Sequence, residues 1–427
     1  MEIAEIKGII QEQEKEREKI SKTKIIKRDI DINLLKKFIS QPNILTILGL
    51  RRCGKSVLSW HIMEDKTYGY INFDDEIFYG IKTKDLNVIL KAFYELYGDI
   101  DNLILDEIQN VKGWELFANR LRRTKKVIIT GSNSQMLSGE LATHLTGRHI
   151  DFVLFPFSFK EFCIYKELDV QKIAKAYDTE SLAKIENLLF EYIEKGGLPE
   201  AYIYDKQIIK SIFGDIVRKD VSKRHKVNIE VIENLAKYLV TNYSQEMTYN
   251  KLKNIFLIKK IPTIKNYVKY FEEAYLVFIL ERFSFKLKEQ IIAPKKIYCI
   301  DTGIINSISF KFSRNFGKLF ENVVCIELFR RKSYSQTEVE IYYWKNFQQE
   351  EIDFVIKEGL KIKQLIQVCY DLSDEKTKQR ELKALLKGSK ELKCNNLLII
   401  TNNYEGEEKV EGRIIKHLPL WRWLLQN

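Results

Sequence analysis

The stretch that decides the fold is Gly49-Leu50-Arg51-Arg52-Cys53-Gly54-Lys55-Ser56, which lies between the apolar run Ile44–Leu48 and a segment that predicts a helix, Ser56–Met63. Glycines let backbone N–H groups curl around phosphates, and a helix N-terminus adds the positive end of its dipole. In such a loop Lys55 reaches the β- and γ-phosphates and the Ser56 hydroxyl binds Mg²⁺. The sequence therefore predicts a phosphate-binding loop formed by Gly49, Leu50, Arg51, Arg52, Cys53, Gly54, Lys55, Ser56 and Val57.

A second apolar run, Leu103–Leu105, ends in the two carboxylates Asp106 and Glu107. Carboxylates after an apolar strand can also be a helix N-cap, which favours acidic residues. With a phosphate loop upstream, we expect Asp106 to hold the magnesium, usually through water. Glu107 would orient and deprotonate the attacking water.

A third apolar run, Val127–Thr130, delivers Ser132 and Asn133 to the same edge of the predicted sheet. Either side chain could position the water beside the γ-phosphate. Gly131-Ser132-Asn133 is also an ordinary turn, so both interpretations stay open.

Short apolar runs alternating with helical stretches predict an α/β fold with a parallel sheet and right-handed crossovers. After Phe157 the pattern becomes helical, and short helices followed by a strand pair at Leu276–Phe285 suggest a winged helix. Strands return from Lys295 in a second α/β unit. The expected organisation is an N-terminal helical segment (1–40), a P-loop ATPase core (41–158), a helical lid (159–228), a winged helix (229–292) and a C-terminal α/β domain (293–427). The first helix, dominated by charged residues, is expected to be a solvated face.

Several further motifs accompany the loop, and together they resemble the prokaryotic AAA+ superfamily ATPases. The branch most similar carries a C-terminal restriction-endonuclease-like domain of unassigned role. The motifs are the paired Arg51-Arg52 within the loop, Tyr70–Asp75, Leu105–Gln109, Thr130–Ser134, Leu145–Arg148, Phe155–Phe159 and Gly196–Glu200.

The resemblance implies ATP rather than GTP, with Mg²⁺, bound to an AAA+ core with a helical lid and a winged helix. It also implies Arg148 as an arginine that touches the phosphates, within one subunit or from a neighbour. A surface or DNA-facing role for this arginine is an equal alternative.

The same resemblance suggests a second metal site of the PD-(D/E)xK type in the C-terminal domain, where acidic groups hold Mg²⁺ and a lysine helps to activate water. The matching residues are Glu321, Asp353 and Gln367. The expected lysine position holds Cys369, and a thiol cannot supply the positive charge. Lys361 or Lys363 could substitute, but a fold that does not cleave nucleic acid is favoured.

In the predicted winged helix, the second helix of the pair would contact DNA through Thr263, Lys265, Asn266, Lys269 and Tyr270, with Lys251, Lys253, Lys259 and Lys260 nearby. The alternative is that this helix only packs, because Ile264, Val268, Tyr270 and Phe271 follow a helical core stripe.

The composition is that of an ordinary globular protein, with 45% hydrophobic and 30% charged residues. A net charge of +11 suits an anionic partner such as DNA, or simply a lysine-rich solvated surface. Six scattered cysteines and five histidines lack disulfide or zinc spacing, and no apolar run is long enough for a membrane span. We expect a soluble cytoplasmic protein without membrane contact, able to form oligomers.

These features predict an ATP-hydrolysing protein whose nucleotide state controls binding to DNA or a protein partner. One alternative is an ATP-gated, metal-dependent DNA nuclease. Another is an ATP-dependent signalling switch in which nucleic acid takes no part.

Overall fold

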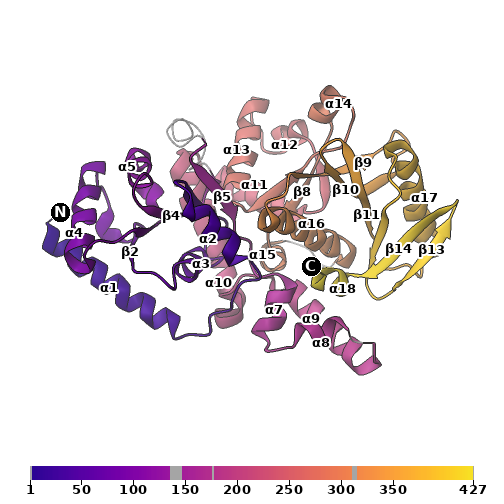
Figure 1. Ribbon diagram of the computed structural model, residues 1–427. Helices are drawn as coiled ribbons and strands as arrows, with labels where there is room; N and C mark the ends of the chain where they lie inside the picture. Colours follow the sequence, from indigo (N-terminus) through magenta and orange to yellow (C-terminus); the bar gives the residue numbers. More distant parts are fainter. Residues whose placement is uncertain (1, 135–146, 176, 310–314, 427) are drawn as a thin grey trace. The chain divides into compact units, whose positions relative to one another are not determined.

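The computed structural model describes residues 2–134, 147–175, 177–309 and 315–426, and it divides into two compact units, Met1–Phe155 and Pro156–Asn427 (Figure 1).

The first unit is built on a five-stranded sheet in the order β2-β3-β4-β1-β5, with every pair parallel. All five residues of both β1 and β3 are buried, as expected for strands covered on both faces. The parallel sheet predicted from the apolar runs is therefore confirmed. The strands are β1 (Ile44–Leu48), β2 (Tyr68–Asn72), β3 (Asn102–Asp106), β4 (Lys126–Gly131) and β5 (His149–Val153).

The first unit also contains an N-terminal helix that is less solvated than expected. Ile6, Ile9 and Ile10 of α1 are buried, and the helix contacts α4 and β2. The Gln13 side chain donates to Asn72 O (3.1 Å) and accepts from Asn72 N (2.9 Å), which ties α1 to the end of β2. These isoleucines form an apolar stripe at helical spacing, which the many charged residues of the segment made hard to recognise in the sequence. The helices are α1 (Ile3–Ser21), α2 (Ile32–Ser40), α3 (Lys55–Ile62), α4 (Leu86–Tyr97) and α5 (Trp114–Leu121), with 3₁₀ turns η1 (Glu76–Phe78), η2 (Thr83–Asp85) and η3 (Ile108–Asn110).

The second unit begins with helices and then forms a three-stranded antiparallel sheet in the order β6-β8-β7. The strand pair expected within Leu276–Phe285 is wrong, because only β7 is a strand there and its partner is β8. The elements are α7 (Phe159–Tyr165), α8 (Val170–Ala174), α9 (Thr179–Lys195), α10 (Ala201–Asp215), the π-helix η5 (Ile216–Lys223), α11 (Ile229–Thr241), β6 (Gln245–Met247), α12 (Tyr249–Ile255), α13 (Ile261–Glu273), β7 (Val277–Leu280), α14 (Leu287–Ile292) and β8 (Lys295–Cys299).

The rest of the second unit is a six-stranded mixed sheet in the order β13-β14-β12-β11-β10-β9. The return of strands expected from Lys295 is confirmed, whereas β13 and β14 carry too many charges for a buried-strand pattern. The elements are α15 (Thr302–Ile308), α16 (Phe316–Ser335), β9 (Val339–Lys345), β10 (Glu351–Glu358), β11 (Lys361–Val368), α17 (Glu375–Leu392), β12 (Leu397–Thr401), β13 (Gly406–Val410), β14 (Arg413–Pro419) and α18 (Leu420–Leu425).

The Gly196-Gly197 pair occupies a crowded junction of the second unit. Gly197 N donates to a buried Asp301 carboxylate oxygen (2.6 Å), and Gly197 O accepts from Phe157 N (2.7 Å). Gly196 has φ +79°, and a Cβ there would meet the same carboxylate at 2.1 Å. These glycines are therefore required by close backbone packing.

Within the described parts of the chain, every helix is too short or too polar to cross a bilayer.

Candidate nucleotide site

The predicted phosphate loop and the acidic strand end meet at one edge of the first sheet. β4 lies between β1 and β3, and because all three strands are parallel, their carboxyl ends lie side by side. The register pairs Leu48 with Gly131, so the loop from Gly49 starts next to the end of β4. The edge of a parallel sheet at the carboxyl ends of its strands is where ligands bind in open α/β folds.

The loop takes a shape that requires its glycines. Gly49 has φ +143°, and a Cβ there would meet Leu154 O at 2.2 Å. Gly54 has φ +98° and is the N-cap of α3, which begins at Lys55. Arg52, with φ +64°, is also left-handed. The loop therefore turns tightly into the N-terminus of α3, as a phosphate cradle requires.

Lys55 lies inside this turn with only 5% of its surface exposed. Its ammonium donates to Gly49 O (3.2 Å) and Leu50 O (3.1 Å) and lies 3.7 Å from the Glu107 carboxylate. The structure thus brings together two predicted catalytic residues that are far apart in the sequence.

Asp106 is buried at the end of β3, where three hydroxyl groups surround its carboxylate. Tyr70 donates to Oδ2 (2.8 Å), Thr130 donates to Oδ1, and the Ser56 side chain also hydrogen-bonds to it. Burial raises the pKa of Asp106, the neighbouring Glu107 charge adds to this, and the hydroxyl donors oppose it. The link between Ser56 and Asp106 places both predicted magnesium ligands together.

Glu107 turns out of the strand with a left-handed φ of +52°. Its N–H donates to Thr130 Oγ1 (3.2 Å), and Gln109 donates to its carboxylate. These contacts aim Glu107 at the loop rather than along the strand. Tyr70, Thr130 and Gln109 position the acidic pair but were not predicted as site residues.

Ser132 and Asn133 both lie fully buried just after β4, at the loop edge of the sheet. Their role beside a γ-phosphate stays a prediction. The structure describes all residues of the Thr130–Ser134 motif. Residues 145 and 146 of the Leu145–Arg148 motif lie outside the described residues.

Arg148 lies at the opposite edge of the sheet. It immediately precedes β5, and its carbonyl accepts from Ile44 N (3.0 Å) at the start of β1. The length of a five-residue strand, roughly 16 Å, therefore separates it from the phosphate loop. Its guanidinium contacts Asn119 Oδ1 (3.4 Å). The prediction that Arg148 reaches phosphates within its own subunit is wrong, and a role toward a neighbouring subunit stays a prediction.

Arg28 is a loop neighbour that the sequence did not reveal. It donates to Cys53 O (3.0 Å) and to Phe155 O (2.6 Å), so it supports the loop from outside. Burial raises the pKa of the Cys53 thiol, which donates to Leu154 O (3.4 Å). Both side chains stabilise the shape of the loop.

A lysine side chain lies between the carboxylates of the second predicted metal site. Glu321 and Asp353 do come together, but the Lys296 ammonium lies between them, 2.9 Å from Glu321 and 3.1 Å from Asp353. The third predicted ligand, Gln367, accepts from Asp353 N (3.3 Å) and donates to Glu381 instead. Among the described residues, no group of three or more His, Cys, Asp or Glu is arranged to hold a metal ion.

Neither Cys369 nor the two suggested lysines supply the water-activating group of that predicted site. Burial raises the pKa of the Cys369 thiol to about 12, so it is neutral at physiological pH. Lys361 and Lys363 are exposed and lie six and four residues before Gln367 on β11, which puts them roughly 13–20 Å away. The suggested substitution by either lysine is wrong.

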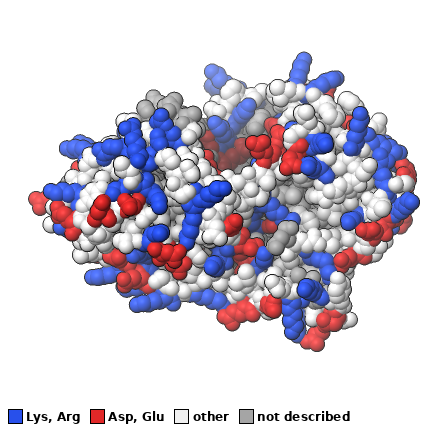
Figure 2. Space-filling model, in the orientation of Figure 1, with Lys and Arg blue, Asp and Glu red and all other residues white. Residues whose placement is uncertain are grey.

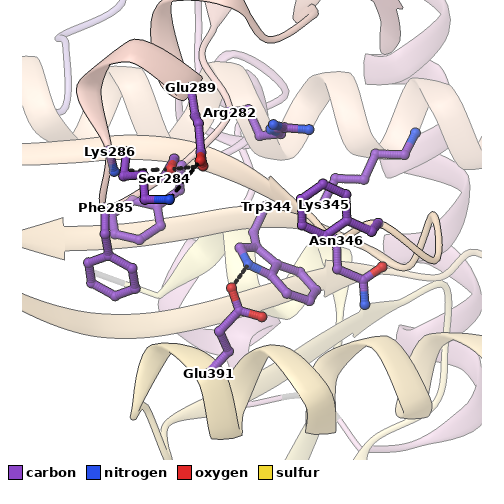
Figure 3. Close-up of a pocket in the computed structure, with 11 residues that line it drawn as sticks. Arg282, Ser284, Phe285, Lys286, Glu289, Trp344, Lys345, Asn346 and Glu391 are labelled. Atoms are coloured by element: carbon purple, nitrogen blue, oxygen red, sulfur yellow. Dashed lines mark hydrogen bonds and ion pairs between the residues drawn. The ribbon is translucent and has the colours of Figure 1, made fainter.

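The second unit also has a pocket of about 210 Å³ beside the segment that follows β7 (Figure 3). Trp344 donates to Glu391 (3.2 Å), Ser284 donates to Glu289 (2.9 Å), and Phe285 lies at the side. None of the residues predicted to act on nucleotide or metal lines this pocket.

Comparison with known proteins agrees with the geometry of the first unit. Residues 41–163 match the family model of an AAA domain. Residues 186–315 and 316–423 match two domains of unknown function. The fold and the loop thus define a protein with an AAA domain of the P-loop type.

The chain is 38% identical to uncharacterized protein MJ1544 of Methanocaldococcus jannaschii over 95% of this chain and 92% of that protein. It belongs to the same family as that archaeal protein. An uncharacterized protein of Haemophilus influenzae is 28% identical over 94% of this chain and 99% of its own length. Among solved structures, the Walker-type ATPase PABY2304 of Pyrococcus abyssi aligns with 66% of this chain and 96% of its own, at 13% identity and a TM-score of 0.40.

Proposed function

We propose that this protein binds ATP with Mg²⁺ and hydrolyses it, and that its nucleotide state controls binding to DNA or to a protein partner. The observation that carries the proposal is the convergence of Lys55 and Glu107, 3.7 Å apart at the ends of separated strands. In P-loop enzymes the chemistry is mostly positioning and charge stabilisation, which a loop, a lysine and an acid pair can supply.

The donor set fits magnesium. Ser56 and Asp106 offer hydroxyl and carboxylate oxygens that already share a hydrogen bond, and Mg²⁺ prefers oxygen ligands. Ser56 and Asp106 would hold the ion, which would supply positive charge to neutralise the charge that develops on the phosphates. Tyr70 and Thr130 keep the Asp106 carboxylate in place.

Lys55 and Glu107 would divide the remaining work. The present acceptors of Lys55 are two loop carbonyls, which phosphate oxygens can replace as stronger, charged acceptors. Glu107, held by Gln109, would accept a proton from the attacking water. Ser132 or Asn133 would orient that water, and Arg148 would act only toward a neighbouring subunit.

For the partner, we propose DNA bound through a winged helix formed by residues 229–292 together with β8 (Lys295–Cys299), which extends the expected domain beyond residue 292. The element order α11, β6, α12, α13, β7, β8 and the sheet order β6-β8-β7 support this assignment. On α13 the buried residues Ile264, Val268 and Phe271 lie on one face, while Lys265, Asn266 and Lys269 are exposed. Packing and DNA contact therefore use different faces of the same helix.

Two predicted contact residues are less suited to this role. Tyr270 stacks on His225 with ring centroids 3.5 Å apart, and Thr263 is half-buried. The proposed interface on α13 therefore rests on Lys265, Asn266 and Lys269, with the exposed Lys251, Lys259 and Lys260 nearby. The net charge alone adds little, because Figure 2 shows basic and acidic side chains intermingled on the face it draws.

The test combines ATP hydrolysis with DNA binding. Phosphate release is measured with and without duplex DNA for the wild type and for Lys55→Ala, and DNA-stimulated release lost in the variant is expected. A Lys265→Ala/Lys269→Ala variant should bind DNA at least about tenfold more weakly and show a shallower salt dependence. A Lys409→Ala/Lys416→Ala variant, which removes two exposed lysines from β13 and β14, is the charge-matched control. Hydrolysis indifferent to DNA would favour the signalling switch.

A further inference from the structure

The second unit contains a buried lysine surrounded by carboxylates from two separate elements. Lys296 lies on β8, and its ammonium is 2.9 Å from Glu321 of α16, 3.1 Å from Asp353 of β10 and 2.5 Å from Glu351 of β10. These four residues are called the lysine cage below. Lys296 is 3% exposed, so the ammonium is almost completely removed from water.

The carboxylates of the lysine cage are held by further contacts. Tyr298 donates to Glu321 (2.7 Å), and Val368 N donates to Asp353 (2.9 Å). Glu351 also lies 3.2 Å from Lys345. Each carboxylate is thus held by a group other than Lys296, so the cluster keeps its carboxylates in place around the ammonium.

With Lys296 in place, the described carboxylates are not arranged to hold a metal ion, but carboxylate oxygens are the ligand type that divalent cations prefer. Burying so much negative charge without a counter-ion would cost several kcal/mol per group. Although burial alone would lower the pKa of Lys296, the Glu321, Asp353 and Glu351 charges raise it. The lysine therefore stays protonated and supplies the positive charge.

We propose that the Lys296 ammonium occupies the position of a divalent cation in the second unit, and that this site is closed to metal for as long as Lys296 is present. The lysine comes from the three-stranded sheet, whereas the carboxylates come from α16 and the six-stranded sheet. The ion cluster therefore joins these two parts of the unit without metal. This inference does not depend on ATP hydrolysis, because none of its residues belongs to the nucleotide site.

The inference predicts that removing the ammonium creates a metal site. Mn²⁺ binding is measured by electron paramagnetic resonance without nucleotide, for the wild type, Lys296→Ala and Lys296→Ala/Asp353→Asn. Lys296→Ala should bind one additional Mn²⁺ at least about tenfold more tightly than any Mn²⁺ bound by the wild type, because both a competing charge and a steric block are gone. The double variant should lose that additional ion. Since all three proteins keep the nucleotide site intact, Mn²⁺ bound there cancels in the comparison.

Two results would overturn the inference. One is a folded Lys296→Ala protein that binds no more Mn²⁺ than the wild type. The other is wild-type Mn²⁺ binding that disappears in the isosteric variant Glu321→Gln, which would mean that metal already displaces the lysine. If Lys296→Ala does not unfold cooperatively, the second comparison decides alone: equal binding by the wild type and Glu321→Gln supports the inference. Normal ATP hydrolysis by Lys296→Ala separates failure here from failure of the proposed function.

Discussion

Lys55 and Lys296 are both almost fully buried next to carboxylates, and their surroundings differ in a way that separates the proposed nucleotide site from the proposed closed cation site. Lys55 is 5% exposed and faces two backbone carbonyls and, at 3.7 Å, one carboxylate. Lys296 is 3% exposed and lies within 3.1 Å of three carboxylates. The two carbonyl partners of Lys55 are neutral, and a phosphate can replace them. The partners of Lys296 are carboxylates, and a neutral group cannot replace them.

The backbone around each lysine explains the difference. Lys55 begins α3 after a glycine-rich turn, and the loop and helix N-terminus there favour anions, although the ammonium itself donates to two loop carbonyls. Lys296 lies on β8, a strand paired on both sides, and its ammonium reaches into acidic side chains. An incoming anion can therefore replace the carbonyl partners of Lys55, whereas Lys296 already has anionic partners.

The largest expected effect concerns ATP turnover. Lys55→Ala should reduce phosphate release at least about 10³-fold, because it removes the positive ammonium that is expected to contact the transferred phosphate. Lys296→Ala should leave the turnover of the folded protein unchanged. Steady-state phosphate release measured on both variants checks the contrast, and undiminished release by Lys55→Ala would refute the assigned site.

In the second prediction, which concerns stability, the Lys296 variant shows the larger effect. Lys296→Met should lower the free energy of unfolding by about 3 kcal/mol, because it leaves buried carboxylates without a counter-ion. Lys55→Met should cost about 1 kcal/mol, since its single carboxylate neighbour stays partly exposed. Urea unfolding followed by tryptophan fluorescence checks this, with Trp344, Trp421 and Trp423 reporting on the second unit. Equal losses of unfolding free energy in the two variants would contradict the proposed difference between the two lysine environments.

The nucleotide site was largely predictable because its signals are local. The loop, its flanking strand and the acidic strand end are continuous motifs, and a parallel sheet brings strand ends together. The sequence does not reveal which hydroxyl groups hold Asp106. Tyr70 looked like part of an apolar strand, although the β2-β3 register places that strand alongside Asp106.

The misplaced arginine has a topological cause. Arg148 stands next to a motif in the sequence, but it precedes β5 and therefore lies at the amino end of a parallel strand. Nearness in sequence to a motif therefore does not place a residue at the phosphate edge of the sheet.

The lysine cage could not be predicted from sequence spacing. Lys296 is 25 residues from Glu321 and 57 from Asp353, and it belongs to a different sheet from Asp353. Two of the three expected ligands were correctly grouped by resemblance, but the cation between them depends on how β8 packs on α16. Such packing is set by the tertiary fold and not by a local pattern.

The third prediction tests the acid paired with the first lysine. Glu107→Gln keeps the shape and the hydrogen-bonding oxygen of the side chain but cannot accept a proton, so turnover should fall about 100-fold or more. ATP binding should persist, because Lys55 and the loop are unchanged. Fluorescent-nucleotide titration beside phosphate release checks both parts, and loss of binding together with turnover would indicate that Glu107 shapes the loop instead.

The smallest expected effect is a pH dependence of stability that arises in the lysine cage. Burial raises the pKa of Glu321 to about 7, with the Lys296 charge opposing and Asp353 adding to the shift. The groups that face Glu321 are Lys296, Tyr298, Lys318, Cys325 and Asp353.

The sign follows from which state holds the proton. Between the ordinary glutamate pKa of about 4.5 and about 7, the folded protein keeps a proton that the unfolded chain has released, so stability falls as pH rises through this range. Below that range both states are protonated and the penalty is absent; above it the penalty is complete. Glu321→Gln should flatten this fall by up to about 1 kcal/mol per pH unit. The free energies of unfolding of the wild type and the variant are measured in urea at about pH 5, 6, 7 and 8, which covers this range. The contributions of other titrating groups cancel in the difference between the two proteins. Parallel curves for the two proteins would mean that Glu321 is ionised throughout and that the lysine cage holds three full negative charges around its single ammonium.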